Sequence, residues 1–123
     1  MISDLCQELR KNPNMQAATD AVNSIAMRAV VKEIYATQAI GRITAGIAND
    51  LTFIYRDNLL TDEEIAEAAK DCVERNLDEF YIYIPDSVLD IVSEVLIKET
   101  EVERYYGYVT MQDITNIFDA YSK

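Results

Sequence analysis

Apolar residues recur at steps of three and four positions along most of this chain, which is the spacing of one buried face of an α-helix. The longest such run begins after Asn14 and reaches Tyr55. One helix of about 42 residues would extend roughly 60 Å, twice the width of a compact domain of this size. The run is therefore expected either to break, near Gly41 or Gly46, or to form a rod that packs against a second copy.

The middle of this run is rich in alanine and glycine, so its backbone can approach a neighbouring helix closely. The pattern does not say whether that neighbour belongs to the same chain. If the protein assembles with itself, the predicted oligomer interface consists of Ala36, Ile40, Gly41, Ile43 and Ile47.

Several local signals mark where further helices begin and end. A short helix is expected over residues 4–11. Thr61 and Glu64 have the spacing of a capping box, in which each residue satisfies a backbone amide of the other. Thr110 has a similar place before the last apolar run, and Gly107 suits a left-handed helix end just before it. These signals predict helices that start at residues 61 and 110.

Residues 77–84 fit two different patterns. Phe80, Ile82 and Ile84 alternate with tyrosines, as in a β-strand, yet Leu77, Phe80 and Ile84 also continue the helical stripe that precedes them. The helical reading is favoured, with the helix ending before the proline that follows. The alternative is a short strand over residues 80–84.

The chain is expected to form one all-α domain over residues 1–123, a compact bundle of five or six helices. Its 3 Gly and 2 Pro are few, which favours long uninterrupted elements. Charge divides this domain into two parts. Residues 1–56 carry 6 basic and 5 acidic side chains, whereas residues 57–123 carry 5 basic and 17 acidic ones. The second half therefore holds a net charge of −12 within a total of −11.

A field of this sign selects partners, because it attracts cationic proteins and repels nucleic acid and anionic membranes. We therefore expect a basic protein as the partner, with no direct binding to nucleic acid or membrane. No stretch approaches the roughly 20 apolar residues of a membrane span, and the first residues lack the pattern of a signal peptide. The protein is expected in the cytoplasm, where Cys6 and Cys72 would remain reduced core residues.

The side chains available for catalysis are few. The chain has no histidine, which removes the commonest general base and a common metal ligand, and its two cysteines lie far apart. No glycine-rich phosphate loop occurs. Carboxylates one helical turn apart could in principle bind Mg²⁺, but the pattern favours a solvated helix face with nearby lysines and arginines. We therefore expect no enzyme activity, no catalytic residue, no cofactor and no metal.

Carboxylates and tyrosines are the remaining candidates for contact with a partner. Acids at successive turns of two adjacent helices could also imitate a row of nucleic-acid phosphates. Tyrosine offers a large contact area together with a hydroxyl group, and the chain has 8 Tyr and no Trp. The predicted partner-binding residues are Glu63, Glu67, Asp71, Glu74, Asp86, Asp90, Glu94, Tyr81, Tyr83, Tyr105 and Tyr106.

In size, charge and helical content the chain resembles the small acidic inhibitors encoded by phages and mobile elements, some of which mimic DNA. That resemblance implies a non-enzymatic protein that binds and inhibits a basic, nucleic-acid-handling protein in an anti-defence role. The alternative is a self-assembling scaffold or adaptor whose N-terminal helix makes a homodimer. The two hypotheses are compatible, since a dimer would double the acidic surface.

Overall fold

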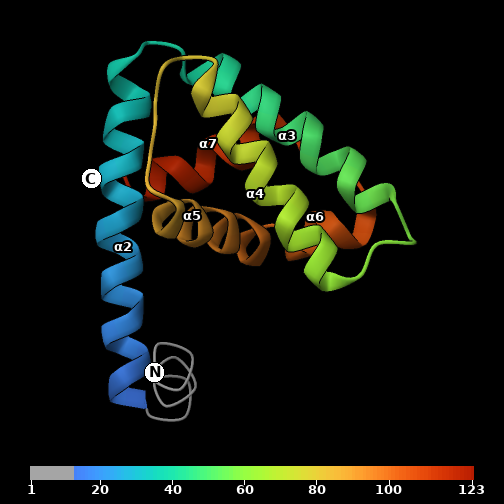
Figure 1. The fold of residues 1–123 in the computed structure, drawn as a ribbon, viewed down its shortest axis with the longest axis horizontal. Helices are drawn as coiled ribbons and strands as arrows, with labels where there is room; N and C mark the ends of the chain where they lie inside the picture. The colour runs from blue at the N-terminus through green and yellow to red at the C-terminus, as the bar shows by residue number, and fades with distance from the viewer. Residues whose placement is uncertain (1–12) are drawn as a thin grey trace.

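A computed structural model describes residues 13–123, and in this range the chain is all-α, as predicted. The part described contains six helices and no strand (Figure 1). Their bounds are α2 (Pro13–Ala36), α3 (Ile40–Arg56), α4 (Asp62–Asp78), α5 (Asp86–Glu99), α6 (Glu101–Tyr106) and α7 (Met111–Ala120). The short helix expected over residues 4–11 and the predicted core position of Cys6 lie outside the described residues.

The long apolar run breaks at residues 37–39, just before Gly41, so the predicted break is present, but neither Gly41 nor Gly46 forms it. The Thr37 hydroxyl donates a hydrogen bond to the Ile34 carbonyl (2.6 Å) and accepts one from the Ala39 amide (3.1 Å). Gln38 adopts a left-handed backbone with φ of 60°. This turn satisfies the freed backbone groups at the end of α2 and sends α3 off in a new direction (Figure 1).

Residues 79–84 form neither the favoured helix nor the alternative strand, because α4 ends at Asp78. The Tyr81 amide donates to the Asp78 carbonyl and the Ile82 amide to the Leu77 carbonyl, both at 3.0 Å. These two bonds, with Tyr81 left-handed at φ of 61°, are a Schellman motif. Leu77 and Ile82 are both buried, which supplies the apolar contact that accompanies this helix end.

The start and end signals predicted for the other helices are confirmed. Thr61 and Glu64 form a complete capping box at α4, and Thr110 forms one with Asp113 at α7. Gly107 is left-handed, with φ of 69°, at the end of α6. These contacts involve neighbours in sequence, which is why the amino-acid pattern alone predicts them.

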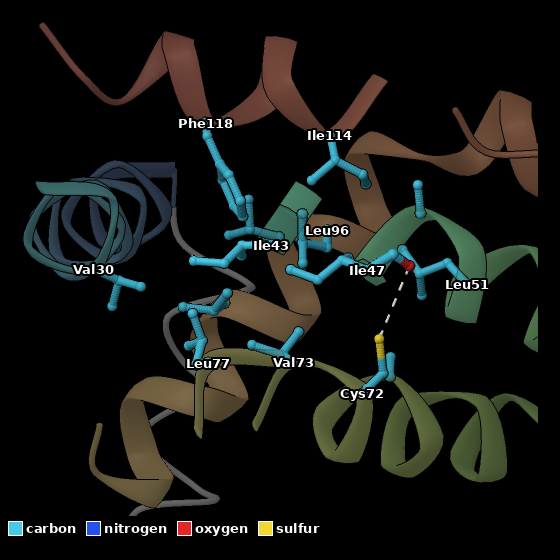
Figure 2. Close-up of a cluster of buried hydrophobic side chains, with 14 of the residues drawn as sticks. Val30, Ile43, Ile47, Leu51, Cys72, Val73, Leu77, Leu96, Ile114 and Phe118 are labelled. Carbon is cyan, nitrogen blue, oxygen red and sulfur yellow. Dashed lines mark hydrogen bonds between the residues drawn. The ribbon is translucent and has the colours of Figure 1, made fainter. Parts of the chain in front are cut away.

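The core gathers around α3, which packs between α4 and α7, and α5 also packs against α4. Figure 2 shows Ile43, Ile47 and Leu51 of α3 lying between the ribbons of α4 and α7. Their neighbours in this cluster include Val73, Leu77, Leu96, Ile114 and Phe118. The inner face of α4 is therefore fixed by the core, and its opposite face is left to solvent.

Candidate protein-binding surface

The outer face of α4 carries a row of carboxylates, which we call the acidic ridge: Glu63, Glu67, Asp71, Glu74 and Asp78. All five are exposed, because the core holds the opposite side of the helix at Ile65, Ala69 and Val73. Successive ridge residues are three or four positions apart, so each lies about one turn from the next. None of the ion pairs described for residues 13–123 involves the ridge.

The carboxylates predicted on α5 do not extend this ridge into a second free row. The Lys70 ammonium lies 2.8 Å from Asp86 Oδ2 and 2.9 Å from Asp90 Oδ1. The hydrogen bond to Asp86, and to a smaller extent the one to Asp90, raises the pKa of Lys70, so the Lys70 ammonium stays charged. Glu94 points elsewhere and lines a groove of about 690 Å³ between α5 and the N-terminal part of α2. Of the predicted acidic partner residues, those on α4 are therefore the more available.

The basic residues on α4 find partners on other elements rather than on their own helix. Sequence spacing suggested that Arg75 would pair with Asp71, but the Arg75 guanidinium lies 3.0 Å from Asp50 on α3. Asp50 also accepts a hydrogen bond from the Asn76 amide at 2.9 Å. Asp71 is thereby left free within the ridge. No local spacing in the sequence identifies the clamp by Lys70 or the pair with Asp50.

The four tyrosines predicted to contact a partner are all exposed, and they form two groups. Tyr81 and Tyr83 follow α4 directly, and Tyr83 lines a cavity of about 270 Å³ together with Glu74 and Asp78 of the ridge. Tyr105 and Tyr106 lie on α6, where their rings meet edge to face with their centroids 5.2 Å apart.

Helix α6 is tied to the opposite end of α4. The Arg104 guanidinium lies 2.7 Å from the carboxylate of Asp62, the first residue of α4. The two tyrosine groups therefore lie near the two ends of the ridge. Tyr108, which the sequence reasoning did not select, is also exposed, and its ring lies 6.0 Å from the Arg56 guanidinium carbon.

Tyr81 combines an exposed ring with a strained backbone. Its side chain is 82% exposed and its φ of 61° is a left-handed value that glycine adopts without cost. In a Schellman motif this position is usually glycine. A tyrosine held here at a cost to stability, with its ring in solvent, is consistent with a contact role.

The change Tyr81→Gly is expected to raise the free energy of unfolding by about 1 kcal/mol, because it relieves the left-handed strain and removes no buried contact. Denaturant unfolding of the two proteins measures this difference. Tyr83→Gly is the matched control, since Tyr83 is exposed without a positive φ, and this change should not stabilise the protein. An equal or lower stability for Tyr81→Gly would show that the backbone of Tyr81 is not strained.

The residues predicted for an oligomer interface are divided between the core and the surface. Ile43 and Ile47 have no exposed surface and pack inside their own chain, so in this fold they cannot meet a second copy. Ile40 is half-buried against the same core, whereas Ala36 and Gly41 are exposed. The alanine- and glycine-rich part of α3 therefore allows close packing within its own chain.

The buried groups that could react are held in unreactive states. Burial raises the pKa of the Cys72 thiol to about 12, so Cys72 is protonated near neutral pH. Burial likewise raises the pKa of Tyr55, whose hydroxyl lies 2.6 Å from the Thr100 hydroxyl. Within residues 13–123 no group of three or more acidic or cysteine side chains has the arrangement of a metal site. No helix in this range is both long and apolar enough to cross a membrane.

No family model matches this chain, and no curated protein or solved structure is significantly similar to it.

Proposed function

We propose that this protein is a non-enzymatic inhibitor that binds, through the acidic ridge, the cationic surface of a nucleic-acid-handling protein. The observation that supports this proposal is that five exposed carboxylates on the outer face of α4 make none of the ion pairs described for residues 13–123, whereas Asp86 and Asp90 of α5 pair with Lys70. Like charges one helical turn apart repel each other by a few tenths of a kcal/mol per pair. A row kept at that cost is well suited to a cationic partner.

The charge density of the ridge is close to that of one nucleic-acid strand. From Glu63 to Asp78 the helix rises about 22 Å, and the ridge places five carboxylates along that length. One strand of duplex DNA carries about six or seven phosphates over the same length, at roughly 3.4 Å each. A groove that binds a phosphate backbone would therefore attract the ridge with a similar field. The mimicry proposed here is of one strand, because Lys70 partly neutralises the neighbouring row on α5.

The exposed tyrosines near both ends of the ridge supply the anchors that an acidic row lacks. Carboxylates steer association and aromatic side chains contribute most of the buried contact area. Arginine side chains of a nucleic-acid-binding groove can stack on tyrosine rings as well as pair with carboxylates. The protein would act in the cytoplasm. It would be encoded by a phage or mobile element and would block a defence protein of the host.

The test is capture of the partner from an extract of cells in which the protein acts, followed by competition with nucleic acid. The protein should displace a fluorescent DNA or RNA duplex from the captured partner. Its affinity for the partner should fall about tenfold or more between 50 and 500 mM salt, because salt screens exposed charges. Binding that is independent of salt, or that leaves the duplex in place, would contradict the proposal.

A further inference from the structure

Helix α2 has two apolar faces, and the other helices of residues 13–123 cover only one of them. The inner face is buried through Met27, Val30, Val31 and Ile34. The opposite face, which we call the outer face, consists of Ala18, Val22, Ile25, Ala29, Lys32 and Ala36. These six residues are all exposed and alternate at steps of four and three, the spacing of the contact positions of a coiled coil.

Within the described residues, 13–123, the outer face is exposed along its whole length. Val22 and Ile25 are 59% and 68% exposed, which is high for branched apolar side chains. Figure 1 shows α2 at one edge of the molecule, with its N-terminal half extending past the other helices. In heptad terms, Met27 and Ile34 occupy the position farthest from the outer face, so packing against the core leaves that face free.

We propose that the outer face of α2 pairs in parallel with the same face of a second copy of this chain. In that arrangement Val22, Ala29 and Ala36 take the first contact position of the heptad, and Ile25 takes the second. Arg28 then falls at the flanking position that pairs, in a parallel coiled coil, with the residue five places later on the partner. That residue is Glu33. Symmetry forms this ion pair twice.

The charge distribution also favours a second copy at this face. Residues 57–123 carry a net charge of −12, so two identical molecules repel each other when their acidic halves approach. Residues 1–56 have a net charge of +1, and α2 projects from this near-neutral half. The alanines allow the two helices to approach closely, while Lys32 at a contact position lowers stability, so the dimer is a weak one that forms at high concentration.

This inference is independent of the proposed function, and its first test is the oligomeric state. Light scattering should show the molar mass rising from monomer toward dimer between about 10 and 500 μM protein. The double change Val22→Lys and Ile25→Lys should keep the protein monomeric over that range. Both side chains are exposed, so the fold should persist. Phe53→Lys, at an equally exposed site on α3, is the control and should still dimerise. A wild-type protein that stays monomeric at the highest concentration, or a control that loses the dimer equally, overturns the proposal.

The second test fixes the orientation of the helices. Arg28→Glu should weaken dimerisation at least fivefold, and adding Glu33→Arg should restore it. With Cys6→Ser as background and diamide as oxidant, Val22→Cys and Ala36→Cys should each give a disulfide-linked dimer. An antiparallel pair would link only when both cysteines are present in one chain, and that result overturns the parallel arrangement.

Discussion

The change Gly46→Ala is expected to lower the free energy of unfolding by about 2 kcal/mol, because an added methyl group overpacks the contact between α3 and α4. A Cβ atom at Gly46 would collide with the side-chain amide of Asn76. That amide cannot move freely, since its nitrogen donates to Asp50 Oδ2 at 2.9 Å and to the Cys72 carbonyl at 2.8 Å. Accommodating the methyl group breaks these bonds in a largely buried place.

Gly41→Ala on the same helix is the matched control. A Cβ atom at Gly41 meets nothing within 4 Å, so alanine should stabilise α3 by about 0.5–1 kcal/mol through its higher helix propensity. Thermal unfolding should place Gly46→Ala about 8 °C below the wild type and Gly41→Ala slightly above it. If both glycines tolerate alanine equally, α3 and α4 do not approach as closely as described.

Glycine content alone did not distinguish these two positions. The sequence placed the break of the first long run near one of them; the break falls at residues 37–39, just before Gly41, and both glycines lie inside α3. The break depends on a threonine hydroxyl that bonds the backbone and on a left-handed residue that is glutamine, where glycine would have signalled the turn. Gly46 is small because another helix crosses there, which is a tertiary reason.

The end of α4 illustrates the same limit. The apolar stripe of residues 77–84 continues through Phe80 and Ile84, and the stripe alone predicted that the helix would continue. The Schellman motif instead turns the chain at Tyr81, where glycine would normally signal the end. Capping boxes at Thr61 and Thr110 were predictable because both of their partners lie within three residues.

The candidate surface was predictable in one respect. Acids at one-turn steps on an amphipathic helix must face solvent when the apolar residues face the core, and this identifies the ridge on α4. Which of those acids remain free depends on contacts between helices. Lys70 is 16 residues from Asp86 and Arg75 is 25 residues from Asp50, so no local pattern reveals these pairs.

Reversing the charge of the ridge should abolish partner capture. The triple change Glu67→Lys, Asp71→Lys and Glu74→Lys removes the centre of the row and alters the net charge from −11 to −5. We expect the dissociation constant of the complex to rise at least 100-fold, which corresponds to about 2.8 kcal/mol. The protein should remain folded, because these side chains are exposed and the new lysines at 67 and 74 each lie one turn from a ridge carboxylate, Glu63 or Asp78.

The control separates the ridge from net charge in general. Changing Asp20, Glu99 and Glu101 to lysine gives the same net charge of −5 while leaving α4 intact, and all three side chains are exposed. Titration calorimetry or surface binding with the captured partner should show near wild-type affinity for this variant, apart from a slower association rate. An equal loss in both triple variants would mean that the overall charge, rather than the acidic ridge, holds the partner. A ridge variant that binds normally would move the contact to the tyrosines beside α4 or to another face of the molecule.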